Sequence, residues 1–286
     1  MKIAEFNGLR IGLDEQVKIM GVINLSPESF YKGSIKTGPD SILQSAIRQV
    51  KEGADIIDLG AKSTAPYLET EISPEEESER AVKGLKIIID EVKKPISIDT
   101  TRALVAKAAL ENGAKMINDV TGLNDDPELA KVAVEFDVPI ILGATKLNRF
   151  KGNPTERVIS SLEHSIKIAQ KAGIGLDKII IDPDIGFHRI DDFKWYKIDA
   201  HILTHLDSLT EKLQQPICIG LSRKSFIGKI LDIKNPEDRL YGSLGATSIA
   251  ILHGASLIRT HDVRETLETI RVIEKIKEFG LESKAK

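Results

Sequence analysis

Residues 216–228 contain an apolar run, Pro216-Ile-Cys-Ile-Gly-Leu221, that opens directly into Ser222-Arg-Lys-Ser-Phe-Ile-Gly228. An apolar run of this length without alternation predicts a strand covered on both faces, and such strands belong to parallel sheets flanked by helices. Loops that leave the carboxyl ends of these strands are where α/β proteins bind ligands. The two cations and two hydroxyls that follow the run therefore predict a site for a polar or anionic ligand.

Short apolar runs of this kind recur along the whole chain. There are eight, at residues 19–23, 54–59, 95–98, 115–118, 139–142, 178–181, 216–221 and 256–259. The segments between them have helical periodicity and helix start signals, such as the capping box Ser73-Pro-Glu-Glu76. Eight strand–helix units without a linker predict a single (β/α)8 TIM barrel over residues 1–286. A doubly wound open sheet is the alternative.

The two ends of the chain predict smaller features. Asn7-Gly8 lies between two β-rich segments, which predicts a β-hairpin with a tight turn over residues 1–14. We expect this hairpin to plug the bottom of the barrel. Residues 280–286 end in charged and small side chains, and we expect them to fray.

The composition of the chain argues against nucleic acid and membranes as binding partners. The chain is 41% hydrophobic and 29% charged, ordinary values for a globular protein, and its net charge of -3 offers no global attraction for nucleic acid or an anionic membrane. The sequence has no apolar stretch of membrane length and no signal-peptide pattern. Its single cysteine, Cys218, excludes a disulfide framework and a zinc cluster. We expect a cytoplasmic protein with a reduced, buried cysteine and small-molecule ligands.

Polar side chains stand at or just after nearly every predicted strand; only the fifth lacks one. They are Asn24, Asp58, Asp99, Asn118, Asp119, Asp182, Ser222, Arg223, Lys224, Arg259 and His261, with Lys62, Ser63 and Thr64 in the second loop. Each alone could be a turn or helix cap, as Asp99 before Thr100 or His261 before Asp262. In a barrel, however, all these strand ends face one bowl.

Four of these residues suit a flat heterocycle. Asp99, Asn118, Asp182 and Lys224 combine two carboxylates, an amide and an ammonium group, which match a ring with alternating N–H, amino and carbonyl groups. A buried carboxylate that accepts paired N–H donors would fix the orientation of such a ring.

Three other residues suit an anion. Asn24 lies on the first strand, and Arg259 and His261 lie on or after the last, so barrel closure makes them neighbours. An amide oxygen and two cationic donors suit a diphosphate with its metal ion. We therefore expect a heterocycle pocket beside an anion pocket.

Seven sequence blocks in the same order resemble the dihydropteroate synthases, within the wider family of pterin-binding barrels. The blocks are Met20–Phe30, Gly53–Gly60 with Ser63-Thr64, Ser97–Thr100, Ile117–Gly122, Asp182-Pro183 with Gly186-Phe187, Gly220–Gly228 and Arg259–Val263. The resemblance extends from about residue 18 to residue 270. Gly-Leu-Ser-Arg-Lys-Ser-Phe-Ile-Gly is the block most specific to the synthase branch.

The resemblance implies a condensation in which an arylamine such as p-aminobenzoate displaces pyrophosphate from a dihydropterin diphosphate, in folate biosynthesis. Asp99, Asn118, Asp182 and Lys224 would bind the pterin ring, with Phe187 packed nearby. Asn24, Arg259 and His261 would bind the diphosphate, Asn24 through Mg²⁺, while Thr64, Ser222 and Arg223 would shape the mouth where the amine arrives. We expect the catalytic residues to be Asn24, Asp99, Lys224, Arg259 and His261. Family members are commonly homodimers.

Four loops depart from the family pattern. Lys32 stands where the first loop has an acidic residue, Lys62 and Ala65 stand where the second has glutamate and arginine, Gly143–Arg149 stands where Met-His-Met is usual, and Asp184 stands where glycine is common. These departures fall mainly on the arylamine side. Drift in the loops, with Lys62, Lys146 or Arg149 supplying the lost charge, is one explanation. A larger, ribosylated aminobenzene as second substrate is the other.

Two other functions remain open at this level. Methyltetrahydropterin:corrinoid methyltransferases use the same kind of barrel, but a methyl donor has no diphosphate for Arg259 and His261 to hold. A pterin-binding homologue without activity is the third possibility, because the amine-side loops are altered.

Overall fold

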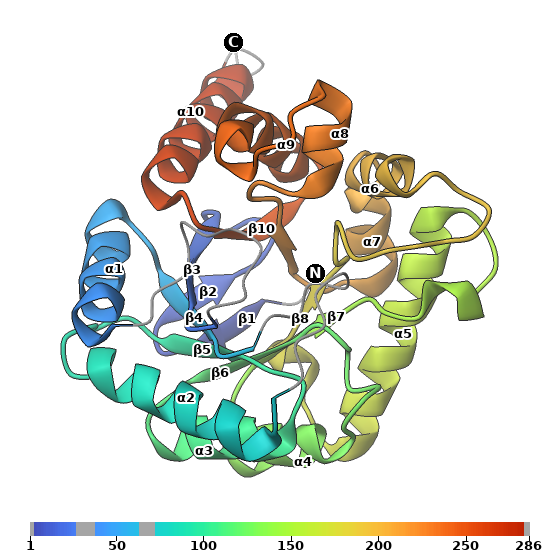
Figure 1. The fold of residues 1–286 in the computed structure, drawn as a ribbon. Coiled ribbons are helices and arrows are strands. Elements are labelled where there is room, and N and C mark those ends of the chain that lie inside the picture. Colours follow the sequence, from blue (N-terminus) through green and yellow to red (C-terminus); the bar gives the residue numbers. More distant parts are fainter. Residues whose placement is uncertain (1–2, 27–37, 63–71, 283–286) are drawn as a thin grey trace.

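Eight parallel strands form a closed barrel in the computed structural model, which describes residues 3–26, 38–62 and 72–282 (Figure 1). The strands are β3 (Lys18–Asn24), β4 (Ile56–Gly60), β5 (Ile96–Asp99), β6 (Met116–Asp119), β7 (Ile140–Gly143), β8 (Ile179–Asp182), β9 (Ile217–Gly220) and β10 (Ala255–Thr260). β10 pairs with both β9 and β3, which closes the barrel. The predicted TIM barrel is confirmed, and the open-sheet alternative is wrong.

Helices form the outer ring around the strands (Figure 1). They are α1 (Pro39–Glu52), α2 (Pro74–Ile88), α3 (Ala103–Glu111), α4 (Glu128–Glu135), α5 (Pro154–Ala172), α6 (Trp195–Leu203), α7 (Leu206–Leu213), α8 (Ser225–Leu231), α9 (Leu240–Leu252) and α10 (Val263–Glu282). Short 3₁₀ helices cover Leu147–Arg149, Leu176–Lys178 and Pro236–Arg239. Among the described residues, two of the eight units carry an extra helix, because both α6 and α7 precede β9 and both α8 and α9 precede β10. None of the helices in the described part of the chain combines the length and low charge needed to cross a membrane.

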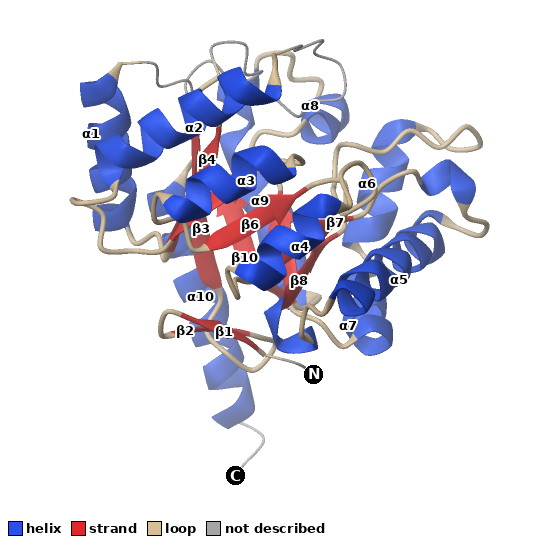
Figure 2. Cartoon of the chain, turned by 90° about the horizontal axis from the view of Figure 1, so that it is seen from below, coloured by secondary structure: helices blue, strands red, loops and turns tan. Residues whose placement is uncertain are grey.

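The N-terminal hairpin plugs one end of the barrel, as expected. Its strands β1 (Ala4–Phe6) and β2 (Leu9–Ile11) are joined by Asn7 and Gly8, whose φ angles of 47° and 75° fit the tight turn that Asn-Gly favours. Ala4 and Ile11 are buried in a cluster with barrel-interior residues. Figure 2 shows the hairpin beneath the strands, on the side where the N-terminus lies.

The interior of the barrel is built in layers. Seven of the eight strands, all but β5, each contribute one buried residue to the lower cluster with the hairpin: Met20, Ile56, Met116, Ile141, Ile180, Cys218 and Leu257. Side chains in a strand alternate between faces, so the residue two positions further on also points inward. On β4, β6, β8 and β10 these next residues are Asp58, Asn118, Asp182 and Arg259, and on β7 and β9 they are Gly143 and Gly220. The apolar plug layer is thus followed by a layer of polar side chains, in which the two glycines carry none.

Candidate active site

The polar layer is centred on an ion-pair network across the barrel. Nε of Arg259 donates to Oδ2 of Asp58 at 2.7 Å, and Nη2 donates to Oδ2 of Asp99 at 2.7 Å. Nδ2 of Asn118 donates to the same Asp58 oxygen at 3.1 Å. Strands β4, β5, β6 and β10 therefore all contribute to one network, and Asp99 does not cap its helix as the alternative reading allowed.

Burial and charge set opposite trends in this network. Desolvation raises the pKa of Asp99 to about 7, although Arg259 acts to lower it. Burial alone would lower the pKa of Arg259, but Asp58 and Asp99 raise it above its ordinary value, so the guanidinium stays charged. Oδ1 of Asp58 and Oδ1 of Asp99 are both buried without a hydrogen-bond partner. Two acceptor oxygens in the bowl are thus ready for ring N–H or amino donors.

A second group lies at the ends of β8 and β9. Nζ of Lys224 lies 4.2 Å from the centroid of the Phe187 ring, which is a cation–π contact. Oδ1 of Asp182 accepts from the backbone N–H of Asp184 at 2.7 Å. Burial raises the pKa of Asp182 and lowers that of Lys224, while the attraction between the two groups counteracts both shifts. A cation, a carboxyl group and an aromatic face thus converge as the sequence predicts.

The Gly186 backbone helps to hold this arrangement. Its φ of 93° is in the region that favours glycine, and a Cβ there would lie 2.9 Å from Cδ of Lys224. The N–H of Gly186 donates to the buried carboxyl group of Asp199 on α6 at 2.8 Å. The hydrogen bond to Asp199 therefore holds the turn after β8, and the side chain of Lys224 packs against Gly186 in that turn.

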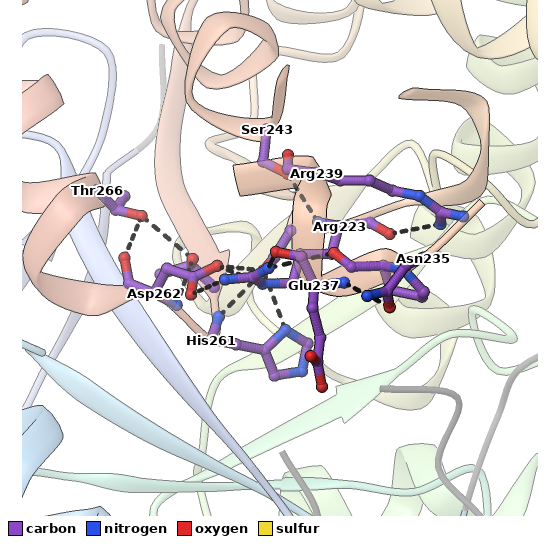
Figure 3. Close-up of polar contacts among 11 residues, drawn as sticks. Arg223, Asn235, Glu237, Arg239, Ser243, His261, Asp262 and Thr266 are labelled. Atoms are coloured by element: carbon purple, nitrogen blue, oxygen red, sulfur yellow. Dashed lines mark hydrogen bonds and ion pairs between the residues drawn. The ribbon is translucent and has the colours of Figure 1, made fainter. Parts of the chain in front are cut away.

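The loop after β9 and the start of α10 form a third group (Figure 3). The guanidinium of Arg223 donates to both carboxylate oxygens of Asp262, from Nε at 3.0 Å and from Nη2 at 2.8 Å. Nη1 of Arg223 also donates to the backbone carbonyl of Pro236 at 3.2 Å. Only 7% of Arg223 is exposed. The resemblance implied a place at the mouth of the site, whereas the structure buries Arg223 against Asp262.

Ser222 links this group to His261. Its Oγ lies 3.0 Å from Nδ1 of His261 and 3.3 Å from Oδ2 of Asp262. Burial, with Arg259, Arg223 and Lys224 nearby, lowers the pKa of His261 to about 3, so the imidazole is neutral near pH 7. His261 and Asp262 also stand just before α10, so the alternative that they begin a helix is confirmed, while a binding role for His261 stays a prediction.

Two predicted site residues remain, Asn24 and Thr64. Asn24 ends β3, and its Oδ1 lies 3.3 Å from the position that a Cβ on Gly60 would take, near the Asp99 carboxyl group. Thr64 lies outside the described residues, as do the departures Lys32 and Ala65. Within residues 3–26, 38–62 and 72–282, no group of three His, Cys, Asp or Glu side chains could hold a metal ion.

Sequence reasoning did not single out three acidic side chains of the site. Asp58 looked like one strand-end residue among many, but the alternation on β4 places it under Arg259. Asp262 appeared only as a helix-start residue, yet it anchors Arg223. Asp184 was noted only as a departure, and it is buried with an unpartnered Oδ2. The inward period of two on each strand could have identified Asp58. By contrast, Asp119 is a turn residue, because it accepts from Thr121 and Leu123.

Comparisons with known proteins agree with this geometry. The model of the pterin binding enzyme family matches residues 20–261. The dihydropteroate synthase of Clostridium beijerinckii is 39% identical over 272 residues, which cover 93% of this chain and 95% of the relative. That of Bacillus subtilis is 35% identical over 260 residues, covering 91% and 88%.

Solved structures of the same enzyme superpose closely. A dihydropteroate synthase from Xanthomonas albilineans with 4-aminobenzoic acid has a TM-score of 0.85 at 31% identity, covering 96% of this chain and 98% of that one. One from Coxiella burnetii in complex with pteroic acid has a TM-score of 0.79 at 34% identity, covering 96% and 97%. With its layered polar bowl and these similarities, the chain belongs to the family of pterin-binding enzymes, among the dihydropteroate synthases.

Proposed function

We propose that this chain condenses 6-hydroxymethyl-7,8-dihydropterin diphosphate with p-aminobenzoate, giving dihydropteroate and pyrophosphate. The observation that carries the proposal is the Asp58–Arg259–Asp99 network, since it joins a ring-binding carboxyl group to the strand that would hold the diphosphate. The amine nitrogen attacks the methylene carbon on the ring, the C–O bond to the diphosphate breaks, and the oxygen keeps the electron pair. The amine loses one proton.

The ring would lie between the acidic network and Lys224. The unpartnered buried oxygens of Asp58 and Asp99 would accept ring N–H and amino hydrogens, and the Asn118 amide and Lys224 would meet ring acceptors. Phe187 would pack nearby and keep Lys224 in place. The absence of a side chain at Gly220, where a Cβ would come no closer than 3.9 Å to another atom, leaves room for a flat ligand.

The diphosphate would bind at the closure of β3 and β10. Because His261 is neutral near pH 7, it would bind an anion as a hydrogen-bond donor rather than as a cation. An anion at Nε2 requires the proton there, and Ser222 would then donate to Nδ1 at 3.0 Å. Arg259 would supply the positive charge. Arg223 would act one step away, as a positioning residue that holds Asp262 and Ser222.

Asn24 fits a Mg²⁺ ion that arrives with the diphosphate. Mg²⁺ usually keeps several waters and takes few protein ligands beside substrate phosphates, so the amide oxygen of Asn24 would be one ligand among phosphate and water oxygens. The ion would neutralise charge on the departing pyrophosphate. The chain's own contribution to the reaction is to align the two substrates and to stabilise that charge, the large terms in such a transfer.

The arylamine would enter beside the loops that depart from the family pattern. Nζ of Lys146 forms an ion pair with Asp125 at 2.8 Å. Arg149 is exposed, so it would be the residue that supplies the charge lost from the family pattern and meets the carboxylate of p-aminobenzoate. We therefore keep p-aminobenzoate as the amine, with a ribosylated aminobenzene as the competing substrate. Competition between the two in a pyrophosphate-release assay decides, because efficient turnover of p-aminobenzoate alone excludes the larger amine.

We also propose a cytoplasmic homodimer. Large apolar side chains are exposed on α9 and α10, namely Leu252 at 60%, Ile276 at 65% and Phe279 at 57%. α9 and α10 pack against each other, so these residues lie on neighbouring helices. Light scattering should show that Leu252→Glu with Ile276→Glu yields a monomer, while the control Val134→Glu on α4 keeps the wild-type mass. A wild-type monomer would contradict the dimer.

The central test is incubation of the protein with the pterin diphosphate, Mg²⁺ and p-aminobenzoate while pyrophosphate and dihydropteroate are followed together. We expect the two products in equal amounts and none without the amine. Pyrophosphate without dihydropteroate would mean hydrolysis, and no product would sink the synthase assignment.

A further inference from the structure

Position 143 faces the bowl but carries no side chain. Ile141 on β7 belongs to the lower interior cluster, so Gly143, two residues on, points inward in the polar layer. A Cβ built on Gly143 would lie 2.1 Å from Oδ2 of Asp184 and 2.5 Å from the carbonyl oxygen of Val120. The Asp184 carboxyl group therefore fills the inward place that a side chain at position 143 would take.

The two positions depart from the family pattern together. Gly143 opens the segment that stands where Met-His-Met is usual, and Asp184 stands where glycine is common. Relative to the family pattern, position 143 has lost a side chain and position 184 has gained one. The geometry explains why the two changes accompany each other, because both side chains would occupy one volume.

Asp184 is held in the bowl at a cost in backbone conformation. Its φ of 52° lies in the left-handed region, which a non-glycine residue adopts at a cost. Asp184 as a whole is 7% exposed, and its Oδ2 atom is buried without any hydrogen-bond partner. It lines a cavity of about 450 Å³ together with Phe187, Val120 and Ala144. A buried, unpartnered oxygen beside the aromatic wall of the bowl is a group that a ligand can satisfy.

Asp184 stands among more acids than cations. Burial first, and then Asp182, Asp119 and Asp99, raise the pKa of Asp184 well above its ordinary value, while Lys224 acts in the opposite direction. Burial and the neighbouring carboxyl groups thus favour the neutral form of Asp184 over its carboxylate. A neutral carboxyl group can donate one hydrogen bond.

We propose that Asp184 is a specificity residue for the ring: its carboxyl group takes the place left by Gly143 and donates a hydrogen bond to a carbonyl oxygen or ring nitrogen of the bound pterin. This inference rests on the proposed function, since it names a contact within the same pterin site. It adds a polar contact at a point where the family pattern has methionine.

Isothermal titration with 6-hydroxymethyl-7,8-dihydropterin diphosphate and Mg²⁺, without amine, tests the contact. We expect Asp184→Gly to weaken binding about tenfold, the effect of about 1.4 kcal/mol. Because glycine relieves the positive φ, the same variant should melt no lower than wild type. Asp184→Asn should stay within about threefold of wild type, since an amide also donates and Asn tolerates this conformation. The exposed neighbour Asp191→Asn is the matched control.

The outcomes separate the possible errors. Binding by Asp184→Gly within twofold of wild type would show that Asp184 does not touch the ring. Loss of affinity in Asp184→Asn equal to that in Asp184→Gly would show that the carboxyl group does not act as a donor. Either result overturns the inference while dihydropteroate formation still stands. Failure of wild type to bind the diphosphate overturns the proposed function as well.

A double-mutant cycle tests the shared volume independently of any ligand. Gly143→Ala should lower the melting temperature in wild type and lower it less in the Asp184→Gly background, because the nearer clash is then gone. Some loss should remain, since the Val120 carbonyl still lies 2.5 Å from the new Cβ. Strictly additive effects would mean that the two positions do not compete for space.

Discussion

Arg259 is the residue on which the proposed chemistry depends most. Arg259→Ala should reduce kcat/KM by a factor that corresponds to about 2–4 kcal/mol, the typical effect of removing one preorganised donor. Steady-state pyrophosphate release measures it, with Arg264→Ala on the exposed face of α10 as control. Wild-type-like activity in Arg259→Ala would contradict the assignment.

The same change also leaves Asp58 and Asp99 without their cation, so folding must be measured beside activity. Arg259→Lys keeps the charge but cannot donate to both carboxyl groups in the same fork. We expect the free energy of unfolding of Arg259→Lys, measured with urea, to lie between those of wild type and Arg259→Ala. A lysine variant with full activity would mean that charge alone suffices.

Residue types predicted much of the site from the sequence. Asp99, Asn118, Asp182, Lys224, Arg259 and His261 all come together in one bowl. What could not be predicted was which side chains pair. Asp99 and Arg259 were assigned to separate pockets, yet they touch at 2.7 Å. Pairing depends on the stagger of strands around the barrel, which no local pattern encodes. Their roles in binding and catalysis stay predictions.

At the level of elements, the start of α10 is fastened to the loop after β9 through Asp262. Its side chain is 14% exposed and faces the 8% exposed side chain of Arg223. Asp262→Asn should lower the free energy of unfolding by about 3 kcal/mol, because a buried guanidinium loses its counter-charge. Urea denaturation measures this, and Asp238→Asn, at an exposed position of the neighbouring 3₁₀ helix, should change it by less than about 0.5 kcal/mol.

Asp262 also contacts Ser222, which in turn contacts His261, so the variant should also bind pyrophosphate more weakly. If Asp262→Asn lost stability but kept its affinity for pyrophosphate, Arg223 and Asp262 would be purely structural.

Strand and helix positions followed well from hydrophobic periodicity, whereas the extra helices α7 and α8 did not. Both are short and lie beside another helix, so their start signals merge with those of their neighbours.

For the whole molecule, buried histidine links stability to pH. Burial lowers the pKa of His188 to about 4, although Nε2 donates to the Pro183 carbonyl at 2.6 Å. The unfolded chain binds a proton near pH 6.5 that the folded protein does not, so stability falls as pH drops from 6.5 toward 4. Between pH 6.5 and 5 the loss should be about 2 kcal/mol.

His188→Gln should remove that share of the pH dependence while keeping a donor for Pro183. Urea unfolding at several pH values measures the difference from wild type, in which other titrating groups cancel. His164→Gln, exposed on α5, should retain the wild-type slope. Parallel curves for wild type and His188→Gln would show that His188 is not responsible.

Closure of the barrel between its first and last strands has a consequence for biosynthesis. β10 pairs with β3 through Leu257 and Lys18, so the sheet cannot close until nearly the entire chain has left the ribosome. Until then β3 and the newest strand both present unpaired edges, which are templates for association with other chains. Chains that end before residue 255 should therefore be insoluble and depend on chaperones, while the complete chain should not.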